Sequence, residues 1–434
     1  MMIPLRPRPL AITGAALAAL LLVGCAASAT PPTGTATTEP SGSAESDADA
    51  DTAPGHGAVA GAAEAPEPPL HLVAIDRSGE VAMLDLLDGT ETALDRVRAP
   101  QRVTTDGRYA FVADDSGVDV IDSGAWTWDH VDHFHYYRAA AGAPGSIAGD
   151  GIATVATGML ATAGGTGLFF PESGEAVLLD NAALASGEIT ETLRLDVGSH
   201  RGIIAPLGTG ALVSAPDEPG GSAETPAASL RAVDAEATDL ATIDCPAAAG
   251  TITTRIAVVV GCADGAVLAT ASPDGAVELE KVAYPSGAAA PATEFSARKG
   301  RPTVAGLGTD SGVWLLDTRE RSWTWVGTAE RPIAATAVDD EAERIVTLTP
   351  AGAVAVLDAT GAILGVSSPL VSGLSTASSG ITAAGVSLTV DAQRAYVNDP
   401  ASGDVFEVDY ADGARVARTL TPAVDAAFLA ETGR

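Results

Sequence analysis

Three of the six histidines of the chain lie in one short polar segment, together with two aspartates. These residues are Asp129, His130, Asp132, His133 and His135. Side chains alternate along an extended strand, so His133 and His135 point to one face and can reach a single metal ion. Asp132 or Asp129 can then accept the second N–H of an imidazole, and His130 is a further or alternative ligand.

Another histidine, His200, lies in the polar segment 198–202. If the chain brings this segment beside the first one, three imidazoles and a carboxylate or water form an ordinary zinc site. The alternative is structural: the HxH pattern decorates a polar strand edge, and His200 caps a turn. The sequence favours the zinc site, with His133, His135 and His200 as ligands and His130, Asp132 and Asp129 around them.

The elements that must position these residues belong to an internal repeat, in which two short apolar strands flank a turn rich in Gly, Asp, Ser or Pro. The copies cover residues 71–85, 109–123, 154–181, 211–234, 256–272, 302–318, 344–360 and 394–410. Their first residues are 38, 45, 57, 45, 46, 42 and 50 positions apart. This spacing is typical of the four-stranded blades of a β-propeller.

The repeat predicts an all-β chain folded as a β-propeller of eight blades, or seven if the loose fourth unit belongs to its neighbour. A spare apolar stretch at 426–430 is expected to complete the first blade and close the ring without an exposed edge. Many strands end in aspartate, which can bond the following backbone and start a turn. The segment with three histidines is expected between the outer strand of one blade and the inner strand of the next.

The N-terminus has the parts of an export signal: Arg6 and Arg8, an apolar run over 10–23, and the sequence Leu-Val-Gly-Cys ending at Cys25. This ending resembles a lipobox, which predicts lipidation of Cys25; the alternative is a plain secretory signal. The chain then divides into a lipoprotein signal peptide, a lipid-anchored acidic disordered linker and a propeller, over residues 1–24, 25–69 and 70–434. The expected location is the extracytoplasmic face of the cell membrane, reached through the lipid anchor only.

Two cysteines remain beyond Cys25, namely Cys245 and Cys262. In an oxidising compartment a disulfide between them is the simpler interpretation, and a pair of soft metal ligands is the alternative.

The charge of the chain excludes one class of partner. With 24 basic and 56 acidic residues the net charge is −32, which argues against nucleic acid because phosphate binding needs a basic surface. No Ser/His/Asp or Cys/His pairing and no phosphate-binding loop is evident, so the sequence does not indicate an enzyme.

Several of these features together resemble the AztD-type zinc metallochaperones. They are the lipobox, the acidic linker, the segment 129–137, His200-Arg201-Gly202, and the Cys245-Pro246 and Gly261-Cys262 dipeptides flanking an apolar strand. The resemblance covers roughly residue 70 to the C-terminus. It implies an extracytoplasmic propeller that binds zinc and delivers it to the solute-binding protein of a zinc ABC importer. The main alternative is a metal-free, membrane-tethered interaction scaffold, and a metal-dependent propeller hydrolase is the enzymatic one.

Overall fold

The computed structural model describes residues 57–129, 133–377, 380–382 and 384–434, all of which belong to one compact unit over 50–434. Strands dominate this part of the chain, and its only helix is the single turn α1 (Asn181–Ala185), so the predicted all-β class is confirmed. No helix in the described ranges is long and apolar enough to cross a membrane.

The first three four-stranded antiparallel sheets come from the N-terminal half and the C-terminal strand. Their strands, from the centre of the ring outwards, are β36 (Phe428–Thr432), β2 (His71–Ile75), β3 (Val81–Asp85) and β4 (Glu91–Leu94); β5 (Arg102–Thr105), β6 (Tyr109–Asp114), β7 (Gly117–Asp122) and β10 (Gly142–Ala148); and β11 (Thr154–Thr157), β12 (Gly165–Phe170), β13 (Glu175–Asp180) and β14 (Glu191–Asp196).

A seven-stranded sheet follows, and three more four-stranded sheets come after it. The seven strands are β15 (Ile204–Leu207), β16 (Gly210–Pro216), β17 (Ala227–Val233), β18 (Asp239–Thr253), β19 (Val258–Cys262), β20 (Gly265–Ala271) and β21 (Val277–Ala283). The four-stranded sheets are β22 (Glu294–Ser296), β23 (Thr303–Leu307), β24 (Gly312–Asp317), β25 (Ser322–Gly327); β26 (Ala334–Ala337), β27 (Ile345–Leu348), β28 (Ala353–Leu357), β29 (Ile363–Pro369); and β32 (Leu388–Val390), β33 (Ala395–Asn398), β34 (Val405–Asp409), β35 (Arg415–Leu420).

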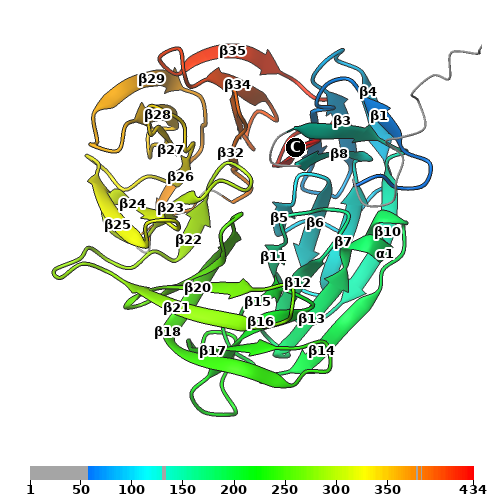
Figure 1. Cartoon of the computed structure of the whole chain (residues 1–434). Coiled ribbons are helices and arrows are strands. Elements are labelled where there is room, and N and C mark those ends of the chain that lie inside the picture. The colour runs from blue at the N-terminus through cyan, green and yellow to red at the C-terminus, as the bar shows by residue number, and fades with distance from the viewer. Residues whose placement is uncertain (1–56, 130–132, 378–379, 383) are drawn as a thin grey trace, which may run out of the picture. The chain divides into compact units, whose positions relative to one another are not determined.

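The sheets surround a common centre, as in a β-propeller (Figure 1). The C-terminal strand β36 pairs antiparallel with β2 and completes the first sheet, as the apolar stretch near the C-terminus predicted. The blade number depends on β18, whose first part pairs with β17 and whose last part pairs with β19. Counting the shared sheet once gives seven blades and dividing it at β18 gives eight, so eight stays a prediction.

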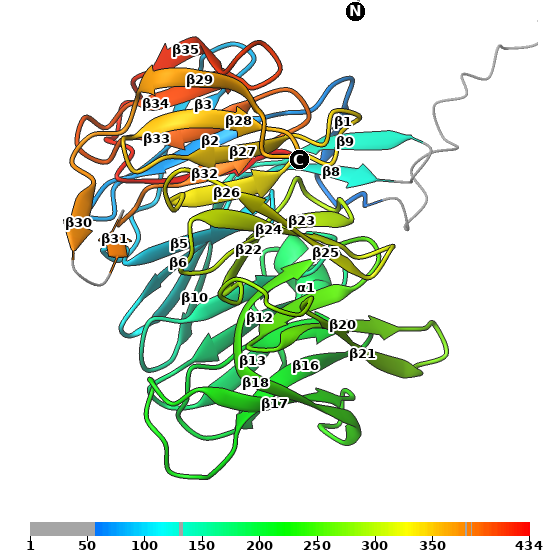
Figure 2. The ribbon, with the colours of Figure 1, turned by 90° about the vertical axis from the view of Figure 1, so that its left-hand side faces the viewer.

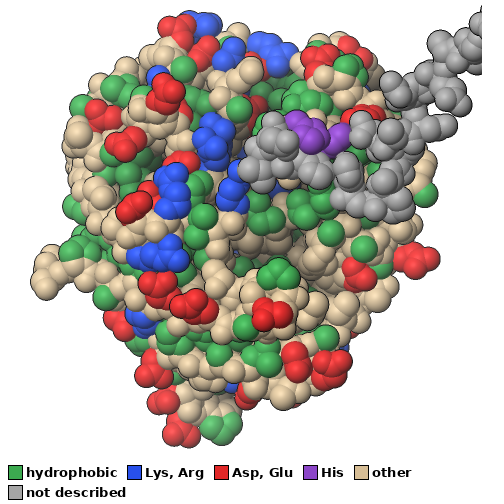
Figure 3. All heavy atoms as spheres, in the orientation of Figure 1, with side chains coloured by type: hydrophobic (Ala, Val, Ile, Leu, Met, Phe, Trp, Pro, Cys, Tyr) green, Lys and Arg blue, Asp and Glu red, His purple; other side chains and the backbone are tan. Residues whose placement is uncertain are grey.

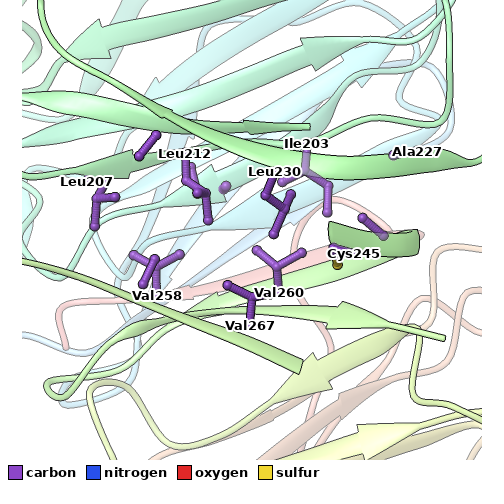
Figure 4. Packing of buried hydrophobic residues seen from close by; sticks show 14 of the residues in the cluster. Ile203, Leu207, Leu212, Ala227, Leu230, Cys245, Val258, Val260 and Val267 are labelled. Carbon is purple, nitrogen blue, oxygen red and sulfur yellow. The ribbon is translucent and has the colours of Figure 1, made fainter. Parts of the chain in front are cut away.

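The two halves of the seven-stranded sheet pack against each other through aliphatic side chains. Figure 4 shows Leu212 and Leu230 from one half facing Val258 and Val260 from the other, all of them at most 5% exposed. A disulfide between Cys245 and Cys262 joins β18 to β19 within this cluster, as predicted for the two cysteines that remain beyond Cys25. A covalent link that closes a loop of this length stabilises a fold by about 3 kcal/mol.

Aspartates at the strand ends do what the sequence predicted. Asp85 accepts the backbone N–H of Leu87 at 2.8 Å, and Asp358 accepts that of Thr360 at 2.8 Å. Each carboxylate therefore fixes the turn that follows its own strand, which explains their recurrence without a ligand.

Strand direction decides which loops share a face of the ring. In each sheet the innermost strand and the third strand run the same way, so the ends of β5 and β7 lie at the same face. The segment between β7 and β10 forms a separate hairpin, β8 (Ala125–Asp129) and β9 (Phe134–Arg138), which projects from that face (Figure 2). The expectation that this segment joins two blades is wrong, because β10 still has to complete the sheet of β7.

Two short pairings lie outside the blades. Strand β1 (Ala63–Ala65) pairs antiparallel with β9, whereas the composition of this segment predicts a disordered linker. Strands β30 (Ser375–Ala377) and β31 (Gly380–Thr382) form a two-stranded sheet between β29 and β32. The predicted signal peptide and the lipidation site Cys25 lie outside the described residues.

Candidate metal site

The β8–β9 hairpin brings two imidazoles together. The Nε2 atoms of His133 and His135 are 3.0 Å apart, and their ring planes meet at 71°. Two nitrogen ligands of a tetrahedral zinc ion lie about 3.3 Å apart, because each bond is about 2.0–2.1 Å long. A small opening of the pair therefore accommodates one zinc ion between the two Nε2 atoms.

A carboxylate orients the buried member of this pair. His135 is 6% exposed, and its Nδ1 lies 2.8 Å from Oε1 of Glu64 on β1. When Nδ1 donates to this carboxylate, the Nε2 lone pair of His135 is left for a proton on His133 or for a metal ion. Glu64 thus has the orienting role that the sequence predicts for Asp129 or Asp132.

Asp129 has a different partner. Its carboxylate forms an ion pair with the guanidinium of Arg255, which lies between β18 and β19. This contact ties the end of β8 to the seven-stranded sheet, which is not adjacent in the ring to the blade that carries the hairpin. His130 and Asp132 lie outside the described residues.

The base of the hairpin is held by buried aromatic and charged groups. Trp126 stacks on Tyr137 at 5.3 Å between ring centroids, and its indole N–H donates to the carbonyl of Gly57 at 2.9 Å. The guanidinium of Arg108 lies 4.0 Å from the centre of the Trp126 ring on the blade side. Because these contacts hold β8 and β9 in register, the imidazole pair stands on a fixed support.

The chain enters the hairpin through a turn that only glycine fits. Gly124 has φ of +67°, and a Cβ at this position would lie 2.4 Å from the carbonyl oxygen of Ala139. A larger residue would therefore separate the two strands at their base.

The C-terminal end of β9, at the base of the hairpin, is anchored to the first blade. Arg138 donates to Asp85 at 2.9 Å, and Nε2 of the buried His71 lies 3.5 Å from the same carboxylate. Nδ1 of His71 donates to the carbonyl oxygen of Pro69 at 2.6 Å, and burial lowers the pKa of this histidine. These three side chains line a cavity of about 320 Å³ at the foot of the hairpin.

The structure does not bring His200 to the imidazole pair. It is fully buried; its Nδ1 donates to the carbonyl oxygen of Gly198 at 2.7 Å, and its Nε2 lies 2.8 Å from Oγ of Ser214. His200 precedes the innermost strand β15, whereas the hairpin follows the end of β7, so the two lie at opposite ends of the strands. Burial lowers the pKa of His200, consistent with a neutral ring that supports the fold.

The donor set on the described residues is therefore smaller than the sequence predicted. No group of three His, Cys, Asp or Glu side chains that can hold a metal is found within 57–129, 133–377, 380–382 and 384–434. The pair of Nε2 atoms fits two of the positions around a zinc ion, and Glu64 fits the outer partner that orients one of them.

Replacing Glu64 tests this arrangement. We expect Glu64→Gln to weaken zinc binding about 10–100-fold, because the amide holds the Nδ1–H of His135 less strongly than a carboxylate does. Competition with a chromogenic chelator measures the affinity. Glu67→Gln removes the same charge from the same exposed segment and is expected to bind zinc normally. Equal affinities for the two variants would contradict the orienting role of Glu64.

The ring of antiparallel sheets places the chain in the class of β-propeller proteins. No protein-family model matches the chain, and no curated protein matches it. Among solved structures, AztD from Citrobacter koseri is similar with a TM-score of 0.70 and 19% identity, over 84% of this chain and 97% of that chain. A structure of apo AztD from the same organism gives the same values.

A third similar structure is that of the dihydro-heme d1 dehydrogenase NirN, with a TM-score of 0.50 and 14% identity, over 85% of this chain and 76% of that chain. At these identities the comparisons establish the fold. The resemblance to AztD expected from the sequence is thus confirmed in the structure of the propeller.

Proposed function

We propose that this protein is a zinc metallochaperone, which holds a zinc ion at His133 and His135 and delivers it to the solute-binding protein of a zinc ABC importer. The observation that carries the proposal is the pair of Nε2 atoms 3.0 Å apart on a projecting hairpin, with Glu64 behind one of them. Similarity to AztD over most of the chain supports the same function.

The exposure of the pair suits a carrier better than a storage site. His133 is exposed while His135 is buried, so an acceptor can replace the outer ligand while the inner one still holds the ion. The ion is the cargo, and its transfer requires no covalent bond to form or break, so the proposed function is not enzymatic.

The proposed location is the extracytoplasmic face of the membrane, with the lipid on Cys25 as the anchor. Tethering raises the concentration of the protein beside a membrane importer. The net charge of −32 also enriches divalent cations near the surface.

Zinc transfer to a cognate solute-binding protein is the direct test. Zinc-loaded full-length protein is mixed with the metal-free acceptor in the presence of a chelator that captures free zinc, and the two proteins are then separated. We expect the ion on the acceptor, because direct ligand exchange bypasses the chelator. If zinc binds but reaches the acceptor only through solution, the chaperone role is wrong.

A metal-free interaction scaffold is the second candidate, and one observation favours it. The described residues contribute two convergent imidazoles but no group of three metal-binding side chains. If full-length protein binds no zinc yet captures the solute-binding protein in a pull-down, the scaffold function replaces the chaperone function.

A further inference from the structure

A cavity lined by basic residues lies at the centre of the ring, on the face from which the hairpin projects. It is a cavity of about 150 Å³, bordered by the ends of the innermost strands β5, β11 and β18, by the segment after β22, and by Arg434. We call it the basic cavity, after its four cationic lining residues Arg298, Lys299, Arg301 and Arg434.

The sign of charge in the basic cavity is opposite to that of the molecule. Acidic residues outnumber basic ones 56 to 24 in the chain, yet Asp106 is the one acidic residue lining this cavity within the described residues. Lys and Arg side chains gather beside the hollow at the centre of this face (Figure 3). Such a local reversal focuses a positive potential on the cavity.

Three donors that belong to described residues lining the basic cavity lack a hydrogen-bond acceptor. Among the described residues, Nε of Arg301, Nε of Arg434 and Oγ1 of Thr251 are buried without a partner. The carboxylates nearest to the two guanidinium groups are 3.4 Å and 3.5 Å away, beyond a good charge-assisted hydrogen bond. Buried donors of this kind are costly unless a bound ligand accepts from them.

The ammonium group of Lys299 is also incompletely compensated. Its Nζ donates at 3.1 Å to an oxygen of the last residue, Arg434, whose chain-end carboxylate adds a negative charge beside this cation. Burial lowers the pKa of Lys299 to about 8; the negative charge of Asp106 raises it and the positive charge of Arg434 lowers it. At Lys299 the effect of burial therefore outweighs the effect of the Asp106 charge.

Asp106 lies beside these cations, and its Oδ2 is buried without a hydrogen-bond partner among the described residues. Its Oδ1 already accepts the backbone N–H groups of Arg108 and Tyr109, each at 2.8 Å. Burial raises the pKa of this carboxyl, which favours its neutral form. Four basic side chains therefore face two carboxyl groups, that of Asp106 and that of the last residue, which leaves the basic cavity with a positive balance.

We propose that the basic cavity binds a small oxyanion of the carboxylate or phosphate type, held by Lys299 and the guanidinium groups of Arg298 and Arg301. Guanidinium groups present paired N–H donors to the oxygens of such an anion, and the Thr251 hydroxyl adds a neutral donor. The volume limits the ligand to the size of inorganic phosphate or a short dicarboxylate. This site is separate from the imidazole pair and does not depend on zinc.

Titration of the full-length protein with two probes tests the proposal. Inorganic phosphate and malonate are added at constant ionic strength with chloride as the reference, and calorimetry and the thermal midpoint are followed. We expect saturable binding of one anion per chain by at least one probe, with a raised thermal midpoint. The responding probe identifies phosphate or carboxylate as the preferred chemistry, and no saturable binding of either would overturn the proposal.

A matched pair of variants locates the site. Arg298→Gln/Lys299→Gln removes two charges from the basic cavity, whereas Arg96→Gln/Arg201→Gln removes two charges from exposed positions. We expect at least tenfold weaker anion binding for the cavity variant and less than a twofold change for the exposed one. Circular dichroism checks that both fold, and equal affinities would refute the assignment.

The pH dependence of malonate binding separates a direct contribution of Lys299 from a general effect of removing positive charge. Malonate keeps its charge between about pH 7 and 9, while Lys299 loses its proton in this range. Affinity for malonate should fall as the pH rises through this window in the wild-type protein. The fall should be smaller in a Lys299→Gln single variant, where Glu431, whose pKa burial raises to about 8, still gains a negative charge beside Arg434. An identical pH profile for the two would remove Lys299 from the site.

Discussion

The double variant His133→Ala/His135→Ala is expected to lose the zinc site. Each imidazole supplies one of the two Nε2 atoms that lie 3.0 Å apart, so removing both leaves no pair of nitrogens to hold an ion on the hairpin. The loss of affinity should exceed the 10–100-fold that is typical of losing an outer partner. Zinc titration of the full-length protein by calorimetry measures stoichiometry and affinity together. The same stoichiometry and affinity in variant and wild type would refute the site.

His200→Gln is the control that separates this site from the three-histidine site the sequence favoured. His200 bonds Gly198 and Ser214 and packs edge-to-face on Phe169 at 4.7 Å. Its replacement should lower the free energy of unfolding by about 2–4 kcal/mol while zinc affinity stays unchanged. If His200→Gln abolishes zinc binding in folded protein, His200 is a ligand after all.

Much of the fold could be predicted because it depends on local patterns. Paired apolar strands with aspartate at their ends recur at the spacing of propeller blades. The apolar stretch that forms β36 follows the last such pair, so the incomplete first blade is the place left for it. The approach of His133 to His135 also follows from the alternation of side chains along an extended strand. The disulfide between Cys245 and Cys262 follows from an oxidising compartment in which two cysteines remain beyond Cys25.

Pairings between distant or weakly patterned segments do not follow from the sequence. Strand β10 contains Pro144 and four glycines or alanines, so its sequence has no strand signal. The hairpin before it is therefore predicted at the wrong face of the ring. That error also placed His200 beside the histidine pair.

Glu64 was missed because nothing in its own neighbourhood indicates structure. Strand β1 has three residues, Ala63–Ala65, in a segment of small and polar residues without hydrophobic periodicity. Its order comes from pairing with β9, so only the three-dimensional fold shows that Glu64 meets His135.

The largest loss of stability is expected from Arg108→Ala. This side chain is 2% exposed and bonds Asp122 through two nitrogens, at 2.9 Å and 2.7 Å. Removing it leaves a buried carboxylate unpaired, which costs about 3–5 kcal/mol. Arg319→Ala, which breaks an exposed pair with Asp317, should cost less than about 1 kcal/mol. Urea unfolding followed by tryptophan fluorescence compares the two, and similar losses would contradict the importance of burial.

Replacing both members of the buried pair distinguishes loss of a charge pair from loss of a support for the hairpin. In Arg108→Met/Asp122→Leu no buried charge remains unpaired, so part of the stability lost in Arg108→Ala should return. Full recovery is not expected, because Asp122 also accepts the N–H of Gly124 at 2.8 Å and Arg108 packs on Trp126. The first contact lies in the turn that leads into β8, and the second lies on β8 itself, so both support the base of the hairpin. The double variant should therefore be more stable than Arg108→Ala and still bind zinc more weakly than wild type, whereas restored stability with wild-type zinc affinity would show that the blade does not position the imidazole pair.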